Sequence, residues 1–274
     1  VENPDMLQLG GEKREMTPFF SDIQGFSTIS EGLTPEELVQ LLNEYLTAMC
    51  DIVSSYHGTI DKFEGDAIIA FWGAPLELPD HATVACHAAI DMQKRNEEMR
   101  KTLREQNRPM LYTRMGMSSG PVVVGNMGSA DRMDYTMMGD VVNLAARLEG
   151  VNKFYQTFTM ISQSTYDLTK DDIDTRQLDV IRVVGKKEPI SVYEVLERKN
   201  QTSSEKSGVV EKYLKALKLY EERNFADASK EFEKVLAIDP DDGPSKTYVK
   251  RCGVFLETPP EKDWDGVYTF TEKG

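Results

Sequence analysis

The order of the apolar runs between residues 19 and 127 is the feature that most constrains the fold. Short runs rich in β-branched and aromatic residues predict strands, whereas apolar positions that recur every three or four residues predict amphipathic helices. Thr34-Pro35-Glu36-Glu37 supplies an N-cap hydroxyl, a Pro at the first helical position and a capping-box Glu, so it predicts where the first helix begins. In chain order the pattern predicts a strand at 19–23, a helix at 35–57, strands at 59–63 and 67–72, a helix at 80–105, and strands at 112–118 and 122–127.

This order is the split βαβ pattern of a ferredoxin-like (βαββαβ) sheet, in which the third strand lies beside the first and runs antiparallel to it. The predicted fold class is therefore α+β. Asp22 ends the first strand and Asp66 precedes the third, so their carboxylates should lie side by side at one sheet edge although 44 positions separate them. Adjacent carboxylates repel each other unless something cationic lies between them. Either Asp taken alone would more simply be a turn former or a helix cap.

The charge balance restricts the partners of the chain. It has 274 residues, with 32 Lys and Arg against 46 Asp and Glu, which gives a net charge of −14. So acidic a surface repels a phosphate backbone, and nucleic-acid binding is not expected. Cys50, Cys86 and Cys252 lack metal-ligand spacing and are interpreted as reduced structural residues. No apolar run reaches about 18 residues, so no membrane span is expected and a cytoplasmic location is predicted.

Composition also predicts the domain boundaries. Residues 1–16 are polar and are interpreted as a linker from an upstream region, because the chain starts at Val1 without an initiator Met or a signal stretch. Residues 17–198 form the predicted main domain, and residues 199–208 a polar linker. Residues 209–274 are predicted to form a small all-α extension, which consists of a tetratricopeptide-like helical hairpin followed by a docking tail. One such hairpin cannot bury its own apolar face, so it should dock on the main domain or on a protein partner.

Three motifs connect this pattern with a known family. They are Phe20-Ser21-Asp22-Ile23-Gln24-Gly25-Phe26, Lys62-Phe63-Glu64-Gly65-Asp66 and the run from Tyr135 to Arg147. In this order and spacing they resemble the successive signatures of class III nucleotidyl cyclases, and the resemblance covers about residues 17–196. It implies that residues 17–198 are a nucleotide cyclase core that converts ATP into 3′,5′-cyclic AMP and pyrophosphate.

The resemblance implies that Asp22, Asp66 and the backbone carbonyl of Ile23 bind two Mg²⁺ or Mn²⁺ ions. Cyclisation requires in-line attack of the ribose 3′ oxygen on the α-phosphorus. Two metal ions about 3.5 to 4 Å apart can activate that nucleophile and neutralise the leaving pyrophosphate. Magnesium prefers carboxylates and substrate phosphates to a closed protein cage, which suits a pair of aspartates.

Contacts with the ribose and the phosphates are implied in the same way. Asn143 orients the ribose and Arg147 contacts the α-phosphate as its charge develops, and their spacing of four places both on one face of a helix. Phe26 and Lys186 belong to the ribose and phosphate site, Lys186 holding the terminal phosphates. Without the motifs, Asn143 and Arg147 would be interpreted as an exposed polar face and Lys186 as a solvated lysine.

Lys62 and Thr136 are expected to recognise the base. Adenine presents an acceptor at N1 and a donor at N6, whereas guanine presents a donor at N1 and an acceptor at O6. Lys62 can donate to adenine N1 and Thr136 can accept from N6, which favours ATP. Family members selective for GTP carry an acidic residue at the position of Lys62, and Thr136 is typical of the bacterial-type branch.

The family also implies the assembly. The metal aspartates of one site come from one subunit and the equivalents of Lys62, Thr136, Asn143 and Arg147 from the other, so a homodimer with two composite sites is expected. The alternatives are a guanylate cyclase and a non-catalytic pseudo-cyclase module, which would have lost a metal, base or phosphate residue. A diguanylate cyclase shares the ferredoxin-like core, but the hairpin at 63–67 lacks its Gly-Gly-Asp/Glu-Glu-Phe run.

Overall fold

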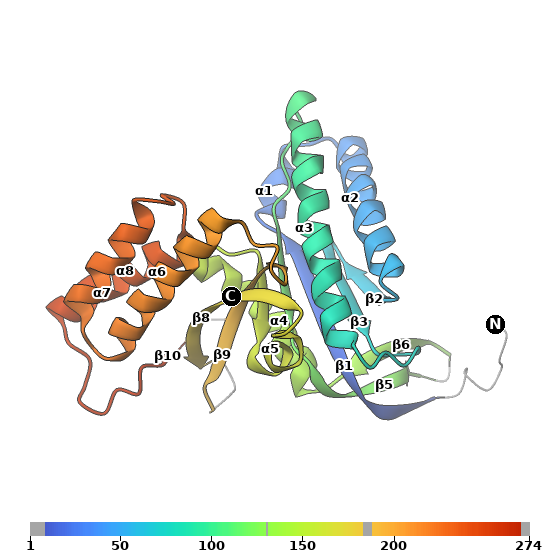
Figure 1. The fold of residues 1–274 in the computed structure, drawn as a ribbon. Helices are drawn as coiled ribbons and strands as arrows, with labels where there is room; N and C mark the ends of the chain where they lie inside the picture. The colour runs from blue at the N-terminus through green and yellow to red at the C-terminus, as the bar shows by residue number, and fades with distance from the viewer. Residues whose placement is uncertain (1–8, 130, 183–187, 270–274) are drawn as a thin grey trace.

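The computed structural model describes residues 9–129, 131–182 and 188–269. These residues form an α+β fold, as predicted (Figure 1). The elements up to the fourth strand are β1 (Gly10–Ile23), α1 (Phe26–Glu31), α2 (Pro35–Ser55), β2 (Thr59–Glu64), β3 (Ala67–Trp72), α3 (His81–Glu105) and β4 (Thr113–Met117). They are followed by β5 (Gly120–Gly128), β6 (Met133–Met138), α4 (Asp140–Tyr155), β7 (Thr159–Ser162), α5 (Gln163–Thr169), β8 (Ile173–Arg182), β9 (Ile190–Arg198), α6 (Ser204–Glu221), α7 (Phe225–Leu236), α8 (Gly243–Glu257) and β10 (Tyr268–Thr269).

The strands of the described chain form one sheet whose centre has the predicted ferredoxin-like order. Along the sheet the order is β10-β8-β9-β7-β4-β1-β3-β2; in addition, β5 pairs with β1, and β6 pairs with β5. Strand β1 runs antiparallel to both β3 and β4, so the first and third strands are neighbours as expected. None of the described helices is sufficiently long and apolar to cross a membrane.

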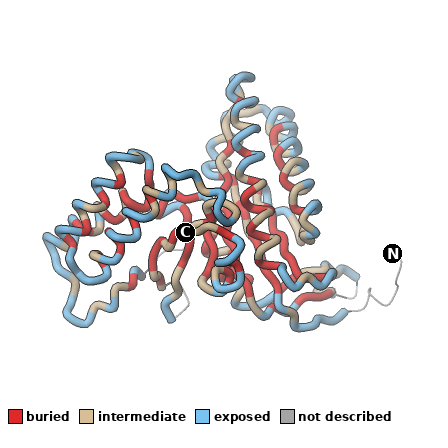
Figure 2. The backbone as a smooth tube through the Cα atoms, viewed as in Figure 1, coloured by how far each residue is buried: buried red, intermediate tan, exposed pale blue. Residues whose placement is uncertain are grey.

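Helices α2 and α3 cover one face of this central sheet (Figures 1 and 2). The predicted capping box begins α2: the Thr34 backbone N donates to Glu37 Oε2 at 2.9 Å, and the Glu37 backbone N donates to Thr34 Oγ1. One stripe of α2, made of Leu41, Tyr45 and Met49, is buried against the sheet. The local sequence therefore sets both the start of the helix and the face that it buries.

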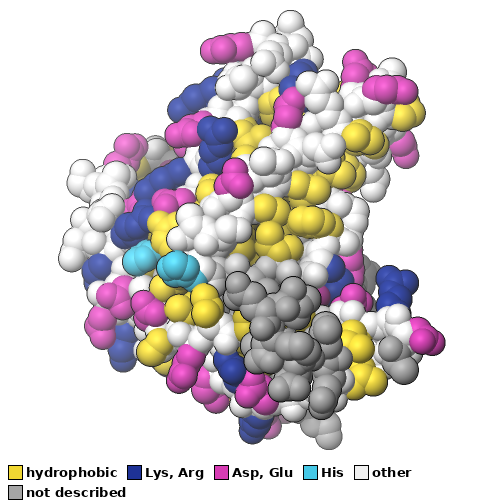
Figure 3. Space-filling view, turned by 90° about the vertical axis from the view of Figure 1, so that its right-hand side faces the viewer, with side chains coloured by type: hydrophobic (Ala, Val, Ile, Leu, Met, Phe, Trp, Pro, Cys, Tyr) yellow, Lys and Arg dark blue, Asp and Glu magenta, His cyan; other side chains and the backbone are white. Residues whose placement is uncertain are grey.

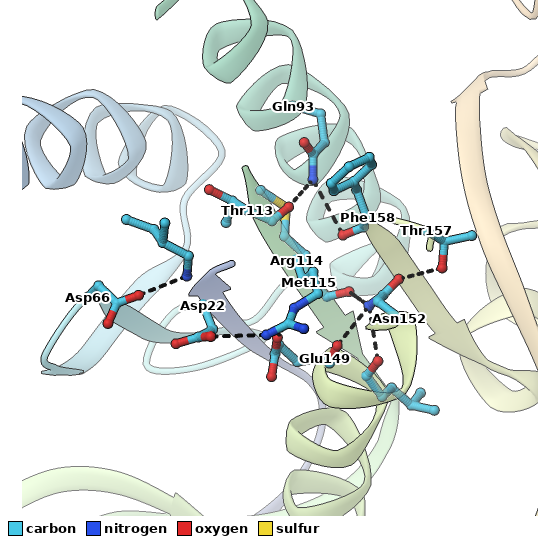
Figure 4. A network of polar contacts seen from close by, with 12 residues as sticks. Asp22, Asp66, Gln93, Thr113, Arg114, Met115, Glu149, Asn152, Thr157 and Phe158 are labelled. Carbon is cyan, nitrogen blue, oxygen red and sulfur yellow. Dashed lines mark hydrogen bonds and ion pairs between the residues drawn. The ribbon is translucent and has the colours of Figure 1, made fainter. Parts of the chain in front are cut away.

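Helix α4 packs on the opposite face, directly over β4. A side chain at Gly116 would lie far inside contact distance of the Glu149 backbone N and the Ala145 carbonyl, so only glycine allows this approach. The Asn152 side chain fastens the helix to the strand, because its Nδ2 donates to the Met115 carbonyl at 2.9 Å (Figure 4). The position of α4 is thus fixed by backbone contact as well as by apolar packing.

The C-terminal extension contains three helices, α6 to α8, where two were predicted. It also contains the short strand β10, which pairs with β8, so the prediction of an all-α extension is wrong. The three helices share one hydrophobic core with α4 and with the strands β7 to β9 (Figure 1). The hydroxyls of Tyr213 and Tyr248 both donate to the Leu178 carbonyl of β8. The extension was expected to dock either on the main domain or on a protein partner, and in the structure it docks on the main domain. Its tetratricopeptide-like character stays a prediction.

A buried ion cluster lies across the junction between the extension and the sheet. The Arg176 side chain on β8 is 1% exposed and ion-pairs with Glu194 of β9 and with Asp242, the N-cap of α8, both at 2.6 Å. Burial alone would raise the pKa of Asp242, but the charge of Arg176 holds the pKa below its usual value. Removing Arg176 would leave the Glu194 and Asp242 carboxylates without the charge that lies between them.

Two predicted boundaries are wrong. Residues 1–16 were expected to be a linker, but Gly10 to Met16 form the first half of β1 and pair with β5. Composition hides this half strand because the side chains from Glu12 to Glu15 are all charged and mostly exposed, whereas its pairing uses the backbone. Helix α6 begins inside the predicted 199–208 linker, since the Ser203 hydroxyl caps it. Pro18 lies within β1 opposite Phe71 and does not interrupt the strand.

Replacing Gly116 should separate α4 from the sheet. We expect Gly116→Ala to lower the free energy of unfolding by about 3 kcal/mol, because the new methyl group has to displace the helix backbone. Chemical denaturation of both proteins measures the difference. A matched control is Gly253→Ala on α8, where a side chain would meet nothing within 4 Å; it should stabilise the helix by about 0.5 to 1 kcal/mol. Equal effects of the two substitutions would contradict this account of α4.

Candidate active site

Asp22 and Asp66 meet at one edge of the sheet, as the strand order predicted. Asp22 lies near the end of β1, and Asp66 follows Gly65 in the turn before β3. Gly65 has a φ of 64°, a conformation that glycine adopts without strain. The Ile23 backbone N donates to Asp66 Oδ2 at 2.8 Å, so the two strand ends are joined directly (Figure 4).

The two aspartates form a site that favours a cation. Burial raises the pKa of Asp66, and the nearby charge of Asp22 raises it further, although the hydrogen bond from Ile23 acts in the opposite direction. In the part of the chain that the structure describes, no group of three or more His, Cys, Asp or Glu side chains is placed to hold a metal ion. A metal at this edge would therefore need further oxygen ligands from the Ile23 carbonyl, water or phosphate, which is the ligand set that Mg²⁺ accepts.

Arg114 and Glu149 extend this site and were missed by the sequence analysis. Arg114 lies directly opposite Asp22 in the β1–β4 pairing, and its Nη2 contacts Asp22 Oδ2 at 3.2 Å. Its Nε lies 3.0 Å from Glu149 Oε1 on α4 (Figure 4). The available signal was one cationic residue within an otherwise uncharged strand. Its partner on α4 could not be identified without the packing of helix on sheet.

Glu149 is poised between two effects. Burial raises its pKa to about 7, and the charges of Asp22 and Asp66 act in the same direction, while the adjacent Arg114 opposes them. The short ion pair with Arg114 would by itself suggest a fully ionised carboxylate. Burial outweighs this ion pair, because Arg114 divides its charge between Glu149 and Asp22.

Asn143 and Arg147 lie in the first half of α4, before Glu149. Asn143 is exposed and Arg147 is half-buried, and their spacing of four places them on the same side of the helix. Asp140 occupies the first turn of this helix. The contacts of Glu149 and Asn152 with β4 therefore hold in place the helix that carries both predicted residues.

Lys62 and Thr136 come together around a third residue, Asp61. Thr136 Oγ1 on β6 donates to Asp61 Oδ2 at 2.6 Å, and Lys62 Nζ lies 3.4 Å from Asp61 Oδ1. The sequence analysis did not identify Asp61, although a charged residue next to Lys62 in a strand-like run was a visible signal. Asp22, Ile23 and Asp66 thus form one group, and Lys62 and Thr136 form a second group around Asp61. Asn143 and Arg147 belong to neither group and lie on α4.

Two predicted residues have less defined surroundings. Phe26 begins α1, just after β1, and packs partly buried against the core that includes Phe19 and Ile23. This position is close in sequence to Asp22 and follows Gly25, the N-cap of α1. Lys186 lies outside the described residues, so its predicted role with the terminal phosphates stays a prediction.

Comparison with known proteins gives a consistent match. Residues 11–197 match the family described as "Adenylate and Guanylate cyclase catalytic domain". The chain is 39% identical over 184 residues to Adenylate cyclase 1 of Rhizobium meliloti, covering 67% of this chain and 28% of that protein. It is 32% identical over 244 residues to the terminal-differentiation-specific adenylate cyclase of Dictyostelium discoideum, covering 87% of this chain and 11% of that protein. The chain therefore spans only a small part of these relatives.

Solved structures agree with the sequence matches. The adenylyl cyclase CyaB from P. aeruginosa superposes with a TM-score of 0.66 at 39% identity, covering 71% of this chain and all of that one. The guanylyl cyclase Cya2 superposes with a TM-score of 0.64 at 34% identity, covering 70% of this chain and 97% of that one. Enzymes named for either base thus share the fold, so the fold alone does not select the substrate.

The raised pKa of Glu149 predicts a pH dependence of stability in the metal-free protein. Because the folded state binds this proton more tightly than the unfolded state, the stabilisation is complete below about pH 4.5 and is lost as the pH rises through about 7. We expect Glu149→Gln to remove a decrease of about 3 kcal/mol across this range. Urea denaturation at a series of pH values, with a chelator present, measures it. Parallel pH profiles for the two proteins would refute the assignment.

Proposed function

This chain belongs to the adenylate and guanylate cyclase catalytic domain family, and we propose that it converts ATP into 3′,5′-cyclic AMP and pyrophosphate. The observation that carries the choice of ATP is the position of Lys62 and Thr136 on either side of the Asp61 carboxylate. A cationic donor next to a hydroxyl that can accept is the pair of groups that adenine requires.

In the proposed complex Lys62 donates to adenine N1, and Thr136 accepts from the 6-amino group. Guanine would present a donor to Lys62 and an acceptor to Thr136, so neither contact would form. A mispaired buried polar group costs on the order of 1 to 3 kcal/mol. Two such mismatches are enough to make ATP the preferred substrate.

Asp22, Asp66 and the Ile23 carbonyl would hold two divalent ions, Mg²⁺ or Mn²⁺. When bound, these ions would activate the ribose 3′-hydroxyl and stabilise the negative charge of the departing pyrophosphate. Burial raises the pKa of Asp66, and the charge of Asp22 adds to this increase; a cation between the two carboxylates would oppose both effects, which supports such a site. The ion pair with Arg114 fixes the orientation of the Asp22 carboxylate.

Asn143 and Arg147 would act on the substrate from one face of α4. Asn143 would orient the ribose so that its 3′ oxygen faces the α-phosphorus. Arg147 would stabilise the charge that develops on the α-phosphate, a contribution of about 3 kcal/mol for a preorganised donor. Phe26 would border the ribose and the phosphates, and Lys186 would hold the terminal phosphates.

We also propose that two copies of the chain pair to complete each site. Large hydrophobic side chains are exposed on the strands that carry Lys62 and Thr136 and on the neighbouring β5, among them Phe63, Val123 and Met138. Figure 3 presents the side of the molecule that lies at the right in Figure 1, and hydrophobic side chains gather there in a band. Exposed apolar surface of this kind is typical of an interface. A two-fold dimer would bring Asp22 and Asp66 of one copy close to Lys62 and Thr136 of the other.

Purified protein should use ATP in preference to GTP. Incubation with either nucleotide and Mg²⁺ or Mn²⁺, followed by identification of the cyclic product by mass, tests the activity directly. We expect Lys62→Glu to lower kcat/KM for ATP at least tenfold and to raise the relative use of GTP, because a carboxylate accepts from guanine N1. Turnover of GTP equal to that of ATP by the unmodified chain would show that the base assignment is wrong.

Mixing inactive variants should restore activity if the sites are shared. Asp22→Ala and Arg147→Ala are each expected to be inactive, since one loses a metal ligand and the other a phosphate contact. In a mixed dimer one site carries both lesions and the other carries neither, so activity should return to about a quarter of the unmodified level with random pairing. Cyclic AMP formation is measured before and after mixing.

The matched control for this experiment mixes Asp22→Ala with Asp66→Ala. Both lesions then affect the same half of each site, so every site in a mixed dimer stays incomplete and activity should not return. Subunit exchange is verified with two different affinity tags. Persistent inactivity of the Asp22→Ala and Arg147→Ala mixture, despite exchange, would mean that each site is built within one chain.

A further inference from the structure

We infer that Asp61 determines the base selectivity of the site by fixing the proton of the Thr136 hydroxyl. This inference rests on the proposed function, since it concerns how the same site distinguishes adenine from other purines. It assigns to Asp61 the role of a positioning residue, because its carboxylate acts on the base through Thr136 and Lys62.

Asp61 reaches this position through an irregularity in β2. The pairing with β3 passes from Ile60 opposite Ala70 to Lys62 opposite Ile69, so Asp61 is the extra residue of a β-bulge. A bulge changes the direction of a side chain relative to the regular alternation of a strand. As a result, the consecutive residues Asp61 and Lys62 contact each other through their side chains.

The Asp61 side chain is 3% exposed, whereas the Lys62 side chain is 41% exposed. A carboxylate that is withdrawn from water needs partners of its own. Its Oδ2 accepts from Thr136, but its Oδ1 is buried without a hydrogen bond to any described residue and has only the charge of Lys62 at 3.4 Å. Buried carboxylate oxygens with so few partners are uncommon in native proteins.

The direction of the Thr136 hydrogen bond carries the inference. A hydroxyl has one proton and two lone pairs, and a carboxylate oxygen can only accept. Because Thr136 donates to Asp61 at 2.6 Å, its proton is committed and the hydroxyl can only accept from a ligand. The 6-amino group of adenine satisfies this hydroxyl, whereas a 6-oxo group faces it with a second acceptor.

Thr136 alone would not discriminate in this way. A free hydroxyl rotates and can donate to a 6-oxo group as readily as it accepts from a 6-amino group. The buried carboxylate removes this choice and also holds Lys62, the second base-reading group, beside it. One side chain therefore presets both contacts before the nucleotide arrives.

The test compares ATP with two analogues. Purine riboside triphosphate lacks the 6-amino group, and inosine triphosphate carries a 6-oxo group. We expect the unmodified protein to lose about tenfold in kcat/KM when the 6-amino group is absent. In Asp61→Asn the side-chain amide can donate to Thr136 and free its proton. The penalty for the missing amino group should then fall to about threefold or less, and the relative use of inosine triphosphate should rise about tenfold.

Two further variants separate this role from a structural one. Asp134→Asn makes the same change at an exposed position of β6, two residues before Thr136, and should leave the nucleotide ratios unchanged. In a Thr136→Val background, which lacks the hydroxyl, Asp61→Asn should no longer change the ratios. A purely structural Asp61 would instead lower the use of all three nucleotides by the same factor in either background.

Binding of the same three nucleotides by isothermal titration calorimetry distinguishes the two levels of proposal. If the unmodified chain binds them selectively but forms no cyclic product, the proposed reaction fails while the binding ratios still test Asp61. If Asp61→Asn leaves the ratios of binding and turnover as they are in the unmodified protein, the inference is overturned and the proposed reaction stands. If none of the three nucleotides binds, both the proposed reaction and the role of Asp61 are overturned.

Discussion

The close packing of α4 on β4 is the contact on which the candidate site depends. Because Gly116 has no side chain, the helix backbone lies directly on the strand, and the helix residue Glu149 reaches Arg114. Arg114 in turn contacts Asp22 on the neighbouring strand β1. A change in the height of α4 above the sheet would therefore shift the carboxylate of Asp22 and the helix face with Arg147 together.

The acidity of the chain makes the local placement of positive charge decisive. A protein with a net charge of −14 repels an anionic nucleotide at long range, so attraction has to come from a few cations at short range. Lys62 is a candidate for this role, because its side chain is 41% exposed. Arg114, in contrast, is paired with Asp22 and Glu149, so its charge serves to hold these two carboxylates in place.

The parts of the site that follow from strand order could be predicted from the sequence, whereas the parts that depend on side-chain packing could not. The adjacency of Asp22 and Asp66 follows once β1 and β3 are neighbours, and the spacing of Asn143 and Arg147 follows once they lie on a helix. The bulge at Asp61 leaves no mark in the apolar pattern of β2.

The same limit applies to the outer parts of the fold. The first half of β1 is polar on its exposed side, so composition suggested a linker where backbone pairing makes a strand. The ion pair of Arg176 with Asp242 joins residues 66 positions apart, and no local signal connects them. The need for docking of the extension, in contrast, was predictable, because short helices cannot bury their apolar faces alone.

The ion cluster around Arg176 affects how firmly the extension is held on the rest of the molecule. Separation of α8 from the sheet would remove Asp242 from Arg176 and leave the buried guanidinium with Glu194 as its remaining ion-pair partner, so the docked position is favoured. The Thr247 hydroxyl of α8 also donates to the Phe154 carbonyl of α4. The helix that completes the ion cluster is therefore fastened to the helix that carries Asn143 and Arg147 as well.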